Sequence, residues 1–265
     1  MNADRARRWL VRYLPPLVVF VAVILLWEVS TAGVGRRVIP PPSAILEAGL
    51  DNLDRPGTAK LINSARNTAV EALGGLIIGT VAGILVAFAS ARWVTSRDIL
   101  LPVAIATSAI PIIAVAPILN NWFGVLNPMS KMMMAALLVF FPVMINVTRG
   151  LVEVQPASLE LMRSYAAGDV AVLRKVRIPN MLPFLFTALK VGATLAFIGA
   201  LVGEYFGGTS EVLGRVVLTS MSSGRFDLAW AGILIGSVAA IAAYLAVSVV
   251  ERVAIPWHVS VRGDQ

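Results

Sequence analysis

The sequence predicts an all-α, polytopic membrane protein: a single domain, residues 1–265, built as a bundle of about six transmembrane helices. Of the 265 residues, 58% are hydrophobic and 14% are charged, and the mean hydropathy is +0.82. A soluble domain is typically about a quarter charged, so a soluble core could not hide this much apolar surface. The apolar runs reach the roughly 20 residues that a helix needs to cross a bilayer. They lack the alternation of barrel strands, so they must be helices, whose backbone groups are paired internally.

Six apolar runs give the expected spans. The first follows several arginines and is too long for a cleaved leader, so we expect a retained helix. The third and fourth runs contain prolines, which predict kinks that membrane helices tolerate, and a gate at these prolines is the alternative. A short surface helix is expected over residues 43–53, between the first two spans. The spans are residues 14–32, 68–91, 99–122, 129–148, 183–203 and 228–250.

The second and fifth spans carry small residues about four positions apart, each set on one helix face. Such a stripe lets a neighbouring helix approach until the backbones touch. We expect these stripes to pack against other helices of the bundle, and a surface that slides during a conformational change is the alternative. The stripe residues are Gly75, Gly79, Gly83 and Ala87, then Gly192, Ala196, Gly199 and Gly203.

The distribution of positive charge predicts the orientation. Lys and Arg residues outside the spans collect on the cytoplasmic side of membrane proteins. If the N-terminus is cytoplasmic, that side holds 13 of these residues and the other side, Lys131 included, holds 8. We therefore expect both termini, and the segment 150–182, to face the cytoplasm.

Charge and missing motifs narrow the function. The net charge of +7 fits basic flanks that contact anionic lipid, and no basic stripe with interleaved aromatics indicates nucleic-acid binding. The chain has no cysteine and one histidine, so we expect no metal site. It has no P-loop, H-E-x-x-H or G-x-S-x-G motif, so we expect no catalytic residue and no enzyme. A membrane enzyme is a competing interpretation, and the lack of any catalytic motif argues against it.

Residues 158–183 read SLELMRSYAAGDVAVLRKVRIPNMLP and predict a short helix, a break near Gly168 and a second helix. Leu159, Met162 and Ala166 indicate an apolar face. Charged residues fill the positions between them, so the segment is too polar to enter the membrane. Taken alone, the pattern also fits a solvated amphipathic loop.

The same segment resembles the EAA loop of binding-protein-dependent ABC importer permeases. That pattern reads Glu-Ala-Ala, three residues, Gly, nine residues, Ile, one residue, then Leu-Pro. Aligned on Pro179, it places its Glu on Glu160, its Gly on Ala166 and its Leu on Ile178, so we expect Gly168 to supply the bend. The resemblance implies docking on a separate ATPase subunit through Glu160, Arg163, Tyr165, Ala166, Ala167, Gly168, Asp169, Ile178 and Pro179.

Other stretches resemble the nitrate, sulfonate, taurine and thiamine-precursor group of these permeases: PPPS at 40–43, PIIAVAPILNNWFG at 111–124, FPVMINVTRG at 141–150 and the closing helix. The resemblance implies a type I ABC importer permease fold in a prokaryotic plasma membrane, and a small polar organic nutrient or oxyanion as substrate. The implied partners are two ATP-binding subunits that carry ATP and Mg, an extracytoplasmic substrate-binding protein, and a second permease chain. We expect a homodimer, with a paired paralogue as the alternative. This chain then needs no cofactor. An ATP-independent secondary carrier or channel is the competing function.

Polar residues within or at the ends of the spans are candidates for a substrate path, because polar groups are costly in lipid and often mark a pathway. Asn120, Asn121 and Glu204 fall toward the expected outer ends of their helices. Neutral amides there suit a polar solute better than a bare anion. For each residue alone, a structural hydrogen bond is the competing interpretation. The candidates are Ser108, Asn120, Asn121, Asn146, Glu204 and Tyr205.

Overall fold

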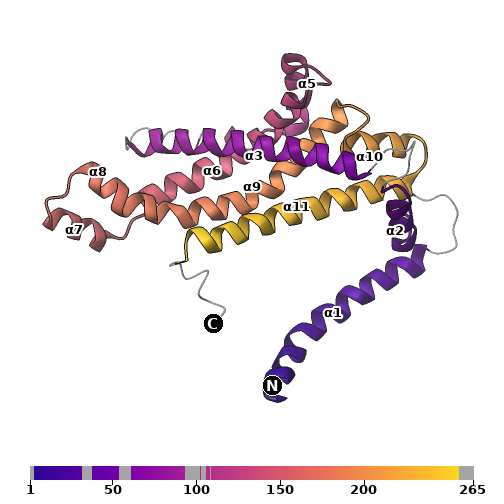
Figure 1. Ribbon diagram of the computed structural model, residues 1–265, viewed down its shortest axis with the longest axis horizontal. Coiled ribbons are helices and arrows are strands. Elements are labelled where there is room, and N and C mark those ends of the chain that lie inside the picture. The colour runs from indigo at the N-terminus through magenta and orange to yellow at the C-terminus, as the bar shows by residue number, and fades with distance from the viewer. Residues whose placement is uncertain are drawn as a thin grey trace.

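The computed structural model describes residues 3–31, 38–53, 61–92, 102, 106–107 and 109–256, and every regular element in these ranges is a helix (Figure 1). Five helical stretches there are long and apolar enough to cross a membrane. Four of them form the bundle, and the fifth, α1, diverges from it (Figure 1). The expected all-α membrane fold is confirmed. The helices of these stretches are α1 (Ala3–Thr31), α3 (Leu61–Arg92), α6 (Pro128–Val152), α9 (Ile178–Phe206) and α11 (Phe226–Ala254).

The core of the bundle lies along α6, which is held between α3 and α9. Ala135 of α6 meets both neighbours: a Cβ on Gly75 would lie 2.3 Å from its Cβ, and a Cβ on Gly199 would lie 2.6 Å from its Cα. Ordinary carbon contacts are roughly 3.5–4.0 Å, so the helices are this close only because these positions are glycine. The expected packing of the small-residue stripes is confirmed here. The buried core includes Ala72, Ala135, Val139, Val143, Val147, Ala196, Phe197 and Ala200.

Helix α1 leaves the bundle at the end where α2 (Pro42–Asp51) lies (Figure 1). The ring of Trp27 in α1 meets the ring of Trp230 in α11 edge to face, with centroids 5.9 Å apart. Ser43 donates to Glu28 from its backbone N at 3.0 Å and from its hydroxyl at 2.6 Å. The expected helix over 43–53 is therefore present, but it begins one residue early, and Ser43 binds α1 instead of capping α2.

The expectation of one continuous helix over residues 99–122 is wrong. The described part turns and bends at Ala109 and Ile110, and α5 (Ile112–Phe123) begins only after Pro111. Proline lacks a backbone N–H and disfavours the helical conformation in the residue before it, so the helix starts anew instead of kinking. With 12 residues, α5 is about 18 Å long, which is too short to cross a bilayer core.

Short helices lie at the two ends of the bundle (Figure 1). At one end, α7 (Pro156–Ser164) is followed by α8 (Asp169–Val172) and by the π-helical turn η1 (Leu173–Arg177), which continues directly into α9. At the other end, α10 (Leu213–Ser222) connects α9 to α11. Helix α10 is not predicted by any apolar run of membrane length, because it is only 10 residues long.

Candidate functional site

The 150–182 loop folds as the expected helix, break and helix, and it turns at Ala166, whose φ of 51° lies in the left-handed region. Ala166 N donates to Arg163 O at 2.9 Å and Ala167 N donates to Met162 O at 3.0 Å, the bonds that close a Schellman turn at a helix end. Gly168 has a φ of −70° and an extended conformation before α8. The expectation that Gly168 supplies the bend is therefore wrong. Ala166 supplies it, at the position where the EAA pattern has glycine.

The α7 side of this loop leaves its side chains largely exposed. Helix α7 has no buried residue, and Leu161 within it is 57% exposed. Tyr165 is 75% exposed and Val170 is 64% exposed. Three large apolar side chains of this loop are therefore largely exposed. Of the candidate docking residues, Glu160, Arg163, Tyr165, Ala166, Gly168 and Asp169 are exposed, and Ala167, Ile178 and Pro179 are half-buried.

The loop is attached to the bundle where α6 ends and α9 begins. Asn180 Nδ2 donates to Gly150 O at 2.8 Å and to Glu153 O at 3.1 Å. A Cβ on Gly150 would lie 2.7 Å from Met181 Cα, so the two helices touch through their backbones here. Sequence reasoning missed Asn180, although an amide directly after the Ile-Pro pair of the EAA pattern is a visible signal.

Asn120 is the buried member of the substrate-path candidates. It is 5% exposed, and its Oδ1 has no partner within the described ranges. Its Nδ2 would lie 2.9 Å from a Cβ added to Gly207, so the amide packs beside the end of α9 that carries Glu204. The structure thus brings Asn120 and Glu204 to the same end of the bundle.

The remaining path candidates are not buried with this pair, although Asn121 and Tyr205 directly follow it in the chain. Asn121 and Tyr205 are exposed. Asn146 donates from Nδ2 to Pro142 O at 2.8 Å within its own helix, about 27 Å along α6 from its first residue. Ser108 lies outside the described residues. The candidates therefore do not form one continuous group.

Two side chains cap the first turn of α10. Glu204 Oε2 accepts from Gly214 N at 2.7 Å, and Thr68 Oγ1 accepts from Leu213 N at 3.0 Å. The first N–H groups of a helix have no acceptor within the helix, so α9 and α3 supply it here. Glu204 therefore positions α10 whether or not it also contacts a substrate.

Glu204 belongs to a cluster of three buried ionisable side chains, with Glu71 of α3 and Lys131 of α6. Their exposed fractions are 0%, 6% and 1% in that order. Lys131 donates from Nζ to Val125 O and to Asn127 O, the latter at 3.3 Å. The expectation that Lys131 is a flanking charge outside the spans is wrong, since it lies inside the bundle. The signal that could have found the cluster is three charges of mixed sign within or next to apolar runs.

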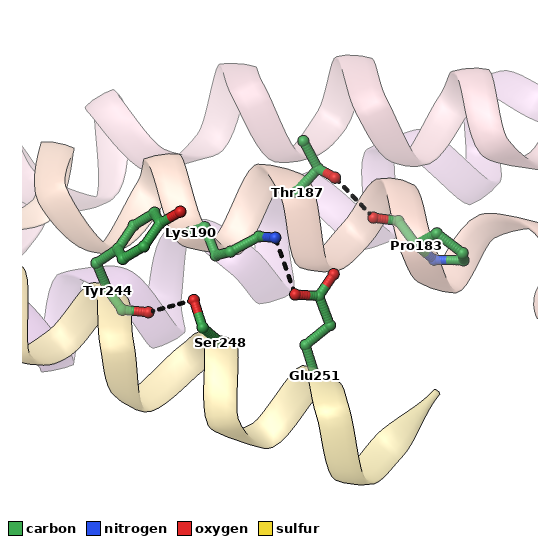
Figure 2. A network of polar contacts seen from close by, with 6 residues as sticks. All are labelled: Pro183, Thr187, Lys190, Tyr244, Ser248 and Glu251. Atoms are coloured by element: carbon green, nitrogen blue, oxygen red, sulfur yellow. Dashed lines mark hydrogen bonds and ion pairs between the residues drawn. The ribbon is translucent and has the colours of Figure 1, made fainter. Parts of the chain in front are cut away.

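A second charge pair connects α9 to α11. Figure 2 shows Lys190 Nζ against Glu251 Oε2, 2.8 Å apart, with side chains 22% and 8% exposed. Thr187 and Ser248 beside this pair each donate to a carbonyl four residues earlier in their own helix. Their hydroxyls are thus satisfied locally, and the ion pair is the polar contact between the two helices at this place.

Comparison with known proteins decides the family. Residues 79–256 match the family described as "Binding-protein-dependent transport system inner membrane component". The chain belongs to this family. The matched part of the permease begins inside α3 and ends just past α11, so it includes the 150–182 loop together with Lys131 and Glu204.

Three relatives cover most of this permease. A protein of Haemophilus influenzae named "Probable ABC transporter permease protein" is 30% identical over 227 residues, 85% of this chain and 90% of its own. The formylaminopyrimidine transport permease protein ThiX of Halalkalibacterium halodurans is 29% identical over 252 residues, 92% and 96% of the two chains. The taurine transport system permease protein TauC of Escherichia coli is 28% identical over 238 residues, 88% and 85%. The expected permease group is confirmed.

The family and the structure agree on the setting of the permease. An inner membrane component with five apolar helical stretches of membrane length in its described ranges is a multi-pass membrane protein. Its relatives are named as transport permeases, which is consistent with a membrane subunit that is not itself an enzyme.

Proposed function

We propose that this permease is the transmembrane subunit of an ABC importer and that its 150–182 loop docks on a separate ATP-binding subunit. The observation that carries the proposal is the exposed α7 side of the loop: the loop lies at one end of the bundle (Figure 1), and its residues Leu161, Tyr165 and Val170 are largely exposed. Apolar side chains with charged neighbours are typical of a protein interface, with an apolar centre and a polar rim. Glu160 and Arg163 provide that rim.

The loop is built to transmit a movement. Residues Asp169 to Phe206 form one helical run through α8, η1 and α9. A displacement at the docking surface therefore reaches the far end of α9, where Glu204 holds α10. Coupling of this kind needs an element with two states, one of which the nucleotide favours. ATP and Mg bind the partner subunit, and this chain needs no cofactor of its own.

We infer an assembly of two identical permease chains and two ATP-binding subunits, because each chain offers one 150–182 loop. Helix α1 supports a second chain, since none of its residues 14–31 is fully buried within the described part of this chain. An extracytoplasmic binding protein delivers the substrate, in keeping with the family description. The assembly lies in the plasma membrane of a prokaryote with both termini, and the loop, in the cytoplasm.

The proposed substrate is a small polar organic nutrient or an oxyanion, of the sulfonate, nitrate or pyrimidine and vitamin-precursor type. The names of the formylaminopyrimidine and taurine relatives support this class. Asn120 Oδ1, which has no partner among the residues that the structure describes, supports a polar contact near the path, because a buried acceptor without a donor costs about 1–3 kcal/mol. Asn121 and Tyr205 lie on the surface nearby in sequence and are proposed contacts of the same path.

Co-purification of the full chain with its ATP-binding subunit tests the docking. Glu160→Arg and Ala166→Trp should each abolish a complex that the wild type forms. Glu47→Arg, which reverses the charge of an exposed residue on α2, is the matched control and should leave the complex intact. Substrate movement into vesicles by a wild-type chain that binds no ATP-binding subunit would contradict the proposal and support an ATP-independent carrier.

A further inference from the structure

Glu71, Lys131 and Glu204 are enclosed at the end of the bundle opposite α7. They come from three different helices, α3, α6 and α9, and each is more than nine-tenths buried. Lys131 packs on α9, since its Cα lies 3.2 Å from where a Cβ on Gly203 would be. The proposed function uses Glu204 only to hold α10, and it gives no role to the ionisable groups of Glu71 and Lys131.

Two oxygen atoms of the cluster lack a donor. Neither Glu71 Oε2 nor Glu204 Oε1 has a hydrogen-bond partner in the part of the chain that the structure describes. Thr68, about one helical turn before Glu71 on α3, and Glu204 bind the adjacent N–H groups of Leu213 and Gly214. This arrangement brings α3 and α9 together at the cluster, with the two carboxyl groups within hydrogen-bonding reach of each other. Two ionised carboxylates are acceptors only and cannot bond to each other. The contact becomes a hydrogen bond when one of the two carries a proton.

The charge balance of the cluster gives the number of protons. Lys131 is the cation that acts on both carboxyls, and its ammonium is bonded to backbone carbonyls near the end of α5. At the same end, α10 contributes Arg215, which packs beside Gly208, and α3 contributes Arg66, which is exposed. With both carboxyls ionised the buried cluster has a net charge of −1. One proton makes it neutral, and a neutral cluster is strongly favoured where water is excluded.

We propose that Glu71 and Glu204 form a proton-binding site that holds one proton per chain in the folded permease. The protonated carboxyl donates a hydrogen bond from its O–H to the ionised carboxylate of the other residue. This hydrogen bond joins α3 to α9. The second oxygen of Glu204 stays free to accept from Gly214 and hold α10. The site is independent of the identity of the substrate and of docking on an ATP-binding subunit.

Infrared spectroscopy of the purified full chain detects the proton directly. At a pH of about 7.5, exposed glutamates are ionised, because their ordinary pKa is about 4.3. The wild type should still show the carbonyl band of a protonated carboxylic acid, shifted in D₂O. Glu71→Gln and Glu204→Gln should each lose this band, because one carboxylate then balances Lys131 without a proton. Glu47→Gln on α2 is the matched control and should keep it.

Unfolding as a function of pH gives a second readout. The unfolded chain releases the proton once the pH exceeds the ordinary glutamate pKa of about 4.3, whereas the folded chain keeps it. As the pH rises above that value, the ratio of folded to unfolded wild type should therefore fall about tenfold for each pH unit, until the folded site also loses its proton. The single Gln variants should lack this slope. The double Gln variant, which leaves Lys131 unbalanced, should be less stable than either single variant, and adding Lys131→Met should restore it. A wild type without the band, a band that survives either Gln variant, or a double variant as stable as the singles would overturn the proposal.

Discussion

Replacing Gly75 with alanine tests whether α6 is held between its neighbours by direct contact of the backbones. The new Cβ would lie 2.3 Å from the Cβ of Ala135 and 2.6 Å from the carbonyl oxygen of Met132. Carbon atoms in contact are roughly 3.5–4.0 Å apart, so α3 would have to move away from α6 by about 1 Å. A carbonyl of the helix backbone cannot turn aside as a flexible side chain can.

The expected loss of stability follows from two opposing terms. Overpacking a well-packed core costs about 1–3 kcal/mol, and a clash with backbone belongs near the upper value. Alanine is about 1 kcal/mol more favourable than glycine within a helix, which offsets part of this. The net loss is about 2 kcal/mol, or a fall of roughly 4–8 °C in the midpoint of thermal unfolding for a chain of this size.

Thermal unfolding of the purified chain in detergent is the assay, and Gly192→Ala is the matched control. Gly192 belongs to the stripe of α9, but an added Cβ there would be 3.3 Å from Val139 Cγ1, a side-chain atom that can adjust. The control should be unchanged or slightly stabilised by the helix preference of alanine. Equal midpoints for the two variants would refute the reasoning, because they would show that a Cβ at residue 75 fits between α3 and α6.

Four further predictions concern the 150–182 loop, the charge pair and the substrate path. Ala166 has a φ of 51°, a conformation that costs an L-residue about 1–2 kcal/mol. In co-purification, Ala166→Gly should therefore keep the complex with the ATP-binding subunit, and Ala166→Val should weaken it. Equal behaviour of the two variants would argue against the strained turn. Asn180→Ala and Asn180→Asp should both lower stability by about 1–2 kcal/mol, because neither side chain can donate to the carbonyls of residues 150 and 153, and a neutral Asp variant in thermal unfolding would contradict this. Lys190→Met should lower the free energy of unfolding by about 2 kcal/mol, because it leaves Glu251 without its partner. In the same assay, the double variant with Glu251→Gln should recover more than half of that loss. If the losses of the two single variants simply add in the double variant, the ion pair makes no joint contribution to stability. In uptake measurements, Asn120→Leu and Asn121→Leu should raise the substrate concentration needed for half-maximal transport, and unchanged values for both would remove the two amides from the path.

The long helices were predictable because lipid leaves few choices to the chain. An apolar run of bilayer length must pair its backbone internally, so composition alone identifies α3, α6, α9 and α11. The glycine stripes were predictable for the same reason, since close approach replaces the burial of large side chains. Both inferences use the residues of one helix only.

Features that depend on contacts between distant segments were not predictable. A proline such as Pro111 is compatible with a kink or with a new helix start, and the packing around it decides between them. Ala166 adopts a left-handed conformation because the turn into α8 requires it, although glycine is the usual residue there. The meeting of Glu71 with Glu204 joins residues far apart in the sequence, so no local pattern contains it.

The contacts at Gly75 and Gly199 restrict how this membrane domain can change shape. Where backbone touches backbone on both sides of α6, a shift by one helical turn would replace Ala135 in these contacts by a bulkier side chain such as Val139, for which there is no space. The helices α3, α6 and α9 are therefore interlocked and must rotate together as a rigid body. Any opening toward one side of the bilayer is left to the joints around them: the start of α5 after Pro111, the two ends of α10, and the seam between α9 and α11.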